Sequence, residues 1–186
     1  MKSFVFTSDW HLRGLPPSTI QTEGFLDLLF NRLSTILGRQ VDFIIHGGDF
    51  FDSYVCDDIS LLNQVISLLK ECNKKIYIVP GNHDLIGYEQ KSILWTSLKT
   101  LENAGLLKIL PPGLNVIEGI NFYVVYPTKD HGPHIYSGLK DCFVLTHNLV
   151  STVKMPFKVT LTDEIAPYLK QCIVLCGDLH YPFVKV

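Results

Sequence analysis

Short apolar runs alternate along the chain with longer segments in which apolar residues recur every three or four positions. The short runs have the length of strands buried on both faces, which read as continuous apolar stretches. They predict strands at residues 4–8, 43–46, 76–79, 122–125, 143–146 and 173–176. The longer segments predict amphipathic helices at residues 25–37, 59–69 and 93–101, the first two with N-caps at Thr22 and Asp58.

Strands that alternate with helices predict an α/β fold in which helices pack on the faces of a sheet. Pro111, Pro112 and Gly113 interrupt the chain after the third helix, and residues 120–126 then predict a return strand in a second sheet. Residues 128–138 predict a long loop. Because no change in composition marks a boundary, we expect one domain over residues 1–186.

The overall charge and composition limit the classes of partner. The chain is 47% hydrophobic and 18% charged, with a net charge of -2, so it lacks the basic excess typical of nucleic-acid binders, and any attraction to DNA has to be local. No apolar run approaches the roughly 20 residues that span a bilayer, and the first residues lack the apolar segment of a signal peptide. The five cysteines form no C-x-x-C pair, which favours reduced thiols in the core. We therefore expect a cytoplasmic protein without a membrane partner.

Polar side chains follow five of the predicted strands, at the point where each strand ends. They are Asp9 and His11, then Asp49, then Asn82 with His83 and Asp84, then His147, and finally Asp178 and His180. Because the carboxyl ends of parallel strands meet at one edge of a sheet, we expect these side chains to lie close together. Carboxylates and imidazoles gathered in this way would repel one another or lack partners without cations. The pattern therefore predicts a site that binds metal cations.

The same residues fall into motifs that resemble a known family. Asp9-x-His11, Gly48-Asp49, Gly81-Asn82-His83-Asp84, a lone His147 and Gly177-x-Leu179-His180 are similar, in this order, to the five motifs of the calcineurin-like metallophosphoesterases. The first three motifs with their neighbours most resemble the Mre11/SbcD branch of DNA-repair nucleases. The resemblance implies a layered αββα sandwich of two mixed sheets flanked by helices. It also implies a metal-dependent phosphodiesterase, here a nuclease that hydrolyses DNA.

The resemblance assigns a role to each ligand. It implies that one metal is held by Asp9, His11, Asp49 and His180, and the other by Asp49, Asn82, His147 and Asp178, so that Asp49 bridges the two. Two divalent ions about 3.5–4 Å apart lower the pKa of a shared water, align it for attack and neutralise phosphate oxygens. Mixed oxygen and imidazole ligands favour Mn²⁺, with Mg²⁺, Fe²⁺ and Zn²⁺ as alternatives. Such a centre would supply the local attraction for DNA.

Residues beside the predicted ligands suggest further roles. His83 is adjacent to Asn82 on a turn, and we expect it to donate a proton or hydrogen bond to the leaving oxygen, with Asp84 orienting its ring. Arg13, His131 and His134 are candidates for substrate contacts, although a solvated position explains each of them equally well. His46 ends a buried strand, which favours a hydrogen-bonded structural histidine over a substrate contact.

The chain departs from the family pattern in two places. The last motif has Asp178 where the family usually has a histidine, which leaves open how the second metal is held. The chain also ends at Val186, shortly after that motif, without the DNA-capping domain and ATPase-binding segment of longer Mre11-like proteins. We therefore expect either a minimal or truncated catalytic domain, or different partners.

Two other functions fit the same residues. One is a phosphomonoesterase, or a phosphodiesterase of cyclic nucleotides or other small molecules. The other belongs to a different class: a catalytically weak scaffold that binds an SbcC/Rad50-like ATPase, in which Asp178 marks decay of the second metal site. The resembling nucleases dimerise through helices near residues 59–69, so a homodimer is a further expectation, although the apolar face of that helix suits a core position better.

Overall fold

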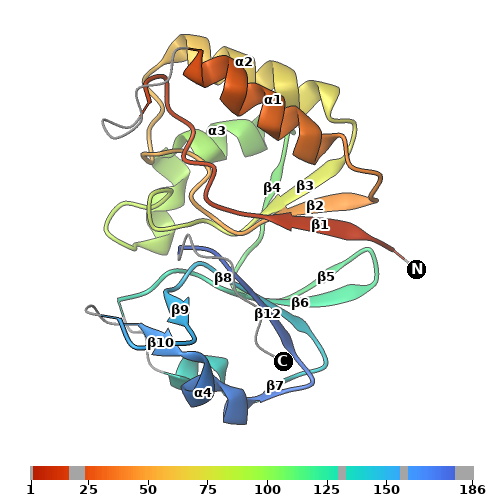
Figure 1. The fold of residues 1–186 in the computed structure, drawn as a ribbon, viewed down its shortest axis with the longest axis vertical. Coiled ribbons are helices and arrows are strands. Elements are labelled where there is room, and N and C mark those ends of the chain that lie inside the picture. The colour runs from red at the N-terminus through yellow and green to blue at the C-terminus, as the bar shows by residue number, and fades with distance from the viewer. Residues whose placement is uncertain (1, 17–23, 130–132, 156–158, 179–186) are drawn as a thin grey trace.

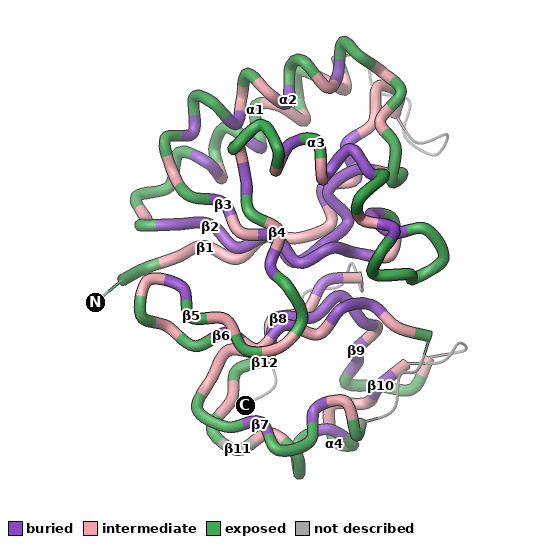
Figure 2. The backbone as a smooth tube through the Cα atoms, turned by 180° about the vertical axis from the view of Figure 1, so that it is seen from behind, coloured by how far each residue is buried: buried purple, intermediate pink, exposed green. Residues whose placement is uncertain are grey.

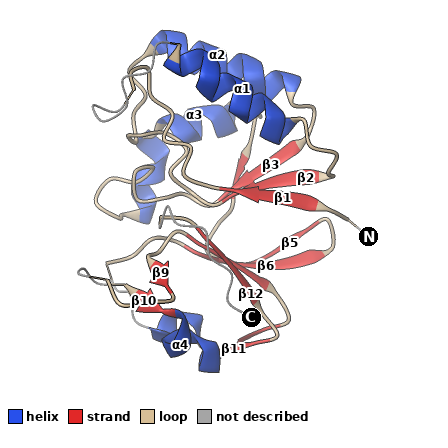
Figure 3. Ribbon diagram, in the orientation of Figure 1, coloured by secondary structure: helices blue, strands red, loops and turns tan. Residues whose placement is uncertain are grey.

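A computed structural model describes residues 2–16, 24–129, 133–155 and 159–178. Two four-stranded sheets lie face to face, with long helices on the outer side of the first and short helical turns on the outer side of the second (Figure 1). Figure 3 shows the resulting order of layers: helix, strand, strand, helix. The predicted αββα sandwich is thus confirmed.

The first sheet is entirely parallel, whereas a mixed sheet was expected. Its order is β1 (Phe4–Thr7), β2 (Phe43–His46), β3 (Lys75–Ile78) and β4 (Lys108–Ile109). The helices between these strands are α1 (Phe25–Leu37), α2 (Ile59–Glu71) and α3 (Ser97–Asn103). Asp58 caps α2 as predicted, because its carboxylate accepts the Leu61 N–H at 3.0 Å. Helices joining every pair of neighbouring strands allow each strand to run in the same direction.

The second sheet is mixed, as predicted. Its order is β12 (Ile173–Cys176), β8 (Phe143–Thr146), β6 (Ile120–Val125) and β5 (Gly113–Ile117), of which only β5 runs antiparallel to its neighbour. Its outer side carries α4 (Thr162–Ile165), η2 (Pro133–Tyr136) and η3 (Ala166–Tyr168). Two short parallel pairs complete this half: β9 (Val150–Ser151) with β10 (Thr160–Leu161), and β7 (Leu139–Lys140) with β11 (Leu169–Lys170).

The two sheets share one apolar core. Phe43 and Ile45 of β2 pack in the same buried cluster as Phe122 of β6 and Leu145 of β8. Figure 2 shows these central strands largely buried, and the outer faces of α1 and α2 exposed. At one end of the core the buried Tyr126 hydroxyl donates to the Leu110 carbonyl at 2.7 Å, which ties the end of the second sheet to the end of the first.

Three local predictions need correction. The helix expected at residues 93–101 is two helices, η1 (Gln90–Trp95) and α3, because Thr96 is extended and its hydroxyl accepts the Lys99 N–H at 3.3 Å. Gly113 does not end an element but begins β5, with a φ of 97° that a glycine tolerates. The segment expected as a loop at residues 128–138 contains η2.

The expected N-cap Thr22 lies outside the described residues, and α1 begins directly after Gly24. Among the described residues, the helices are too short to cross a membrane.

Candidate metal centre

The carboxyl ends of β1, β2, β3, β8 and β12 carry the polar residues predicted from the sequence. Four of these residues adopt left-handed backbone conformations: Asp9 (φ 57°), His11 (44°), Asp49 (54°) and Asp178 (73°). For residues other than glycine such conformations cost of order 1–3 kcal/mol each and persist where the surrounding structure enforces them. Five other described residues share this conformation, but the four predicted ligands lie together at one edge of the sheets, as in a functional site.

Asp49 lies at the centre of the group. Its carboxylate is almost fully buried, with one oxygen, Oδ2, at 3.5 Å from His11 Nε2 and 3.2 Å from His147 Nε2. The other oxygen, Oδ1, accepts the backbone N–H of His83 at 2.9 Å. A single carboxylate thus faces imidazoles from two different motifs, as a bridging ligand would.

The second sheet contributes the opposite wall of the site. His147 Nε2 lies 3.8 Å from Asp9 Oδ1, and that oxygen also accepts the backbone N–H of Asp178 at 3.0 Å. The other ring nitrogen of His147, Nδ1, lies 2.6 Å from the carbonyl of Gly47. Because a carbonyl can only accept, Nδ1 carries a proton, and Nε2 is the nitrogen left to face the carboxylates.

The charges within the cluster suit a site that binds cations. Burial opposes ionisation of both partners, but the hydrogen bond and charge of Asp49, with the charges of Asp9 and Asp178, raise the pKa of His147 to about 9. The same contact with His147 lowers the pKa of Asp49 in spite of its burial. In the absence of a metal, a proton on His147 therefore balances the carboxylates.

The donor atoms fit divalent cations. Ligand atoms of Asp9, Asp49 and His147 lie within 4.8 Å of one another, and so do those of His11, Asp49 and His83. Asn82 Oδ1 is buried and has no hydrogen-bond partner among the described residues, which is costly for an amide oxygen unless it accepts from a ligand. The two groups share Asp49, so the described residues present two adjacent cation positions rather than one.

Glycines let these segments approach one another. A Cβ on Gly48 would lie 2.7 Å from Cγ of His147, and one on Gly81 would lie 2.8 Å from Cγ of Asp49. A Cβ on Gly177 would lie 2.5 Å from His147 Nδ1. These distances are too short for any side chain, so the glycines that precede the polar residues are part of the site.

The structure corrects the role expected of Asp84. Its buried carboxylate accepts the backbone N–H of Gly81 at 2.8 Å and of Phe50 at 3.2 Å, and burial raises its pKa to about 6. Asp84 therefore joins the turn after β3 to the turn after β2 and does not orient His83, because the tight turn directs its side chain back toward the main chain.

Asp52 takes part in the positioning expected of Asp84 and was missed by the sequence analysis. Its carbonyl lies 2.7 Å from Nδ1 of the exposed His83 ring. Its carboxylate lies 3.5 Å from His11 Nδ1 and 2.5 Å from Arg13 Nη2. The only signal in the sequence was the position of Asp52 three residues after Asp49. A contact through a main-chain carbonyl cannot be predicted from the residue type, because every residue has this group.

The remaining candidates are placed as follows. Arg13 lies beside the site and forms an ion pair with Asp52. His46 is fully buried, accepts the Gly48 N–H on Nδ1 at 3.2 Å, and has a pKa that burial lowers to about 3, so it is structural and not a substrate contact. His134 is exposed on η2 and belongs to neither ligand group. His131 and His180 lie outside the described residues.

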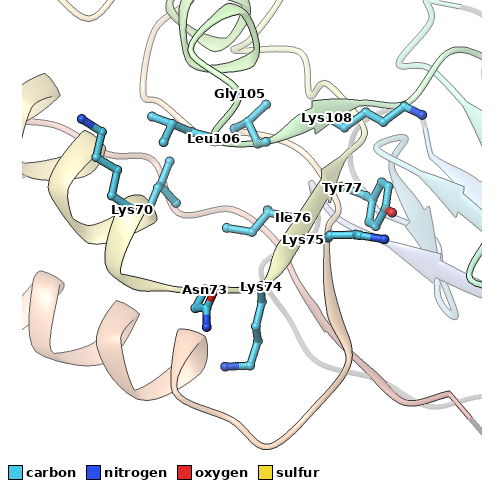
Figure 4. A pocket seen from close by; sticks show the side chains of 11 residues that line it. Lys70, Asn73, Lys74, Lys75, Ile76, Tyr77, Gly105, Leu106 and Lys108 are labelled. Carbon is cyan, nitrogen blue, oxygen red and sulfur yellow. The ribbon is translucent and has the colours of Figure 1, made fainter.

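A cavity of about 630 Å³ lies at the opposite end of β3. Its lining includes Lys70, Lys74, Lys75 and Lys108, but Figure 4 shows their ammonium ends pointing outward from the cavity. Lys74 donates to the Leu37 carbonyl at 2.9 Å, and Lys75 donates to Glu118 at 2.5 Å. The cavity is therefore not part of the metal centre.

Similarity to known proteins extends over nearly the whole chain. The calcineurin-like phosphoesterase family matches residues 2–182. The chain is similar to the DNA double-strand break repair protein Mre11 of Saccharolobus solfataricus, with 28% identity over 77% of this chain and 36% of the relative. It is also similar to the provisionally named phosphoesterase 078R of Invertebrate iridescent virus 3, with 29% identity over 47% of this chain and 24% of that protein. The chain thus spans about a third of the length of the Saccharolobus relative and about a quarter of that of the viral one.

Proposed function

Because the chain belongs to the calcineurin-like phosphoesterase family, whose members hydrolyse phosphoesters, we propose that it hydrolyses phosphodiester bonds of DNA with two divalent cations. The observation that carries the proposal is the position of Asp49. One buried oxygen of this residue lies 3.5 Å and 3.2 Å from imidazoles of two different ligand groups. A shared carboxylate of this kind is what two adjacent cations need.

In this proposal the two cation positions share Asp49, and His83, whose ligand atom lies within 4.8 Å of those of His11 and Asp49, is assigned to the leaving group and not to a cation. Asp9, His11 and Asp49 with His180 would hold one cation, and Asp49, Asn82, His147 and Asp178 would hold the other. When bound, the pair would neutralise phosphate oxygens and lower the pKa of a water for in-line attack. Oxygen and imidazole ligands together suit Mn²⁺, and the carboxylate at Asp178 in place of an imidazole favours Mn²⁺ or Mg²⁺ over softer ions.

His83 would act on the leaving group. The Asp52 carbonyl accepts from Nδ1 at 2.7 Å, which fixes the ring and leaves Nε2 for a proton. The ring also meets the His11 ring edge to face, at 4.9 Å between centroids, so it lies beside the predicted ligands. A protonated Nε2 there can donate to the leaving oxygen.

The choice of DNA rests on the Saccharolobus relative, which is named as a DNA double-strand break repair protein. From the resemblance of the first three motifs to the Mre11/SbcD branch, we further propose an SbcC/Rad50-like ATPase and a second copy of the chain as partners. Asp52 connects Arg13 to the predicted ligand His11, and we assign Arg13 to the substrate phosphates.

A substrate screen tests the proposal. Purified protein with Mn²⁺ is assayed on single- and double-stranded DNA, para-nitrophenyl phosphate and cyclic nucleotides, with Asp49→Asn as the control for contaminating enzymes. We expect cleavage of DNA by the parent and none by the control. Turnover of only the monoester or the cyclic nucleotides would contradict DNA as the substrate and indicate a small molecule instead. No turnover of any substrate by a protein that holds two metals would contradict the enzymatic function.

A further inference from the structure

Two cysteines face each other at the end of the second sheet that is opposite to the metal centre. Cys142 directly precedes β8, and Cys172 directly precedes β12. Their sulfur atoms lie 3.6 Å apart, and both side chains are half-buried. Neither residue has a role in the phosphoesterase site.

The register of the strands explains why the two thiols meet. Leu169 pairs with Leu139, and Ile173 pairs with Phe143. In both parallel pairs the two partners are therefore separated by the same number of residues in the sequence. Between these pairs both strands bend at equivalent positions, where Asp141 and Gln171 have φ values of 53° and 58°. The cysteines follow these bends and lie directly opposite each other.

The backbone at this point has the spacing of a disulfide. The Ile173 N–H donates to the Cys142 carbonyl at 3.2 Å, so the two strands are at their normal separation where the cysteines lie. Neighbouring strands are about 4.8 Å apart. That value falls within the range of about 4.4–6.8 Å between Cα atoms of disulfide-bonded cysteines. Rotation of the side chains can bring the sulfurs to bonding distance without a shift of the strands.

We propose that Cys142 and Cys172 form a dithiol site that small-molecule disulfides oxidise to an intramolecular disulfide. The thiolate of one cysteine attacks a sulfur of the reagent, which forms a mixed disulfide and releases one thiol. The thiolate of the second cysteine then attacks the protein sulfur of the mixed disulfide and releases the second thiol. The chain loses two hydrogen atoms, and the reagent is reduced to two thiols.

The surroundings set the rate of this reaction. Burial, together with the neighbouring Cys172, raises the pKa of the Cys142 thiol to about 11, so it is little ionised at neutral pH. Because the thiolate is the attacking form, the exchange should accelerate as the pH rises. Two of the other three thiols are placed differently: Cys56 Sγ contacts the Asp58 carbonyl at 3.4 Å, and Cys72 Sγ contacts the Leu37 carbonyl at 3.9 Å.

The experiment treats the folded chain with oxidised glutathione at mildly alkaline pH and follows its intact mass and its peptide map. We expect the mass of two hydrogen atoms to be lost, a peptide linking Cys142 to Cys172, and reversal by dithiothreitol. Closing a loop of this length should raise the unfolding temperature by several degrees. Cys142→Ser and Cys172→Ser should abolish the loss, and the matched control Cys56→Ser should retain it.

Glutathione adducts without an internal bond, or a bond that joins other cysteines, would overturn the proposal. The measurement needs no metal and no substrate, so its outcome is independent of the proposed hydrolysis.

Discussion

Gly48 offers the sharpest test of how the metal centre is built. An alanine there would place its Cβ 2.7 Å from Cγ of the buried His147 ring and 2.8 Å from Cα of Gly81. Neither neighbour can yield easily, since one is backbone and the other is a ring whose Nδ1 lies 2.6 Å from the Gly47 carbonyl. We therefore expect Gly48→Ala to displace His147 and open the cluster.

The size of the effect follows from two terms. Gly48 has a φ of 109°, where an L side chain is strained by about 1–3 kcal/mol. Insertion of a methyl group into a packed site costs a further amount of about 1–3 kcal/mol. Gly113 provides a matched control, because its φ is 97° and nothing lies within 4 Å of its would-be Cβ. Gly113→Ala should lose stability through backbone strain alone, without the cost of inserting a methyl group into a packed site.

Urea denaturation of both variants separates these terms. The free energy of unfolding should fall by about 1–3 kcal/mol more for Gly48→Ala than for Gly113→Ala. Binding of Mn²⁺ should weaken in the first variant and remain unchanged in the second. Equal losses of stability together with equal Mn²⁺ binding would refute the account of the packed ligand turns.

Three further predictions concern single side chains. His83→Ala should keep both metals while kcat on the cleaved substrate falls by about 10²–10⁴, and unchanged turnover would show that His83 only shapes the turn. Asp178→Ala should weaken one of the two metals selectively whereas Asp178→His keeps both, as calorimetric titration with Mn²⁺ would show; full binding by Asp178→Ala would exclude it as a ligand. Asp42 has its pKa lowered to about 2 by hydrogen bonds from the Ser3 backbone N–H, the Lys2 ammonium and the Ser3 hydroxyl. The ionised Asp42 carboxylate therefore stabilises the fold above its unfolded pKa, and this contribution is lost as the pH falls through about 4 to about 2. Asp42→Asn should lose that part of the acid dependence of the unfolding temperature, and an unaltered dependence would contradict it.

Much of the architecture could be predicted because burial dictates it. The buried strand Phe43–His46 and the amphipathic helix Phe25–Leu37 have the predicted bounds. A continuous apolar run indicates a strand buried on both faces, and apolar residues at helical spacing indicate a helix with one buried face. Asp9, Asp49 and His147 could be brought together from the sequence because parallel strands end at one edge.

Other features depend on local geometry that residue type does not reveal. The extended backbone of Thr96 divides a segment whose apolar spacing is that of one helix. Asp84 follows His83 in sequence, but the turn directs its carboxylate to main-chain N–H groups of Gly81 and Phe50. Asp52 meets the His83 ring through a carbonyl, a group that every residue has.

The central claim is that one buried carboxylate serves two cations, and metal stoichiometry tests it most directly. Equilibrium dialysis against Mn²⁺, followed by elemental analysis, is carried out on the parent and on Asp49→Asn, which keeps the size of the side chain but removes its charge. Oδ2 of Asp49 lies within 3.5 Å of imidazoles from both ligand groups. Loss of the negative charge of Asp49 should therefore weaken cation binding at both positions. We predict about two ions per chain for the parent and fewer than one for the variant. Two tightly held ions in Asp49→Asn, or one or none in the parent, would contradict the account.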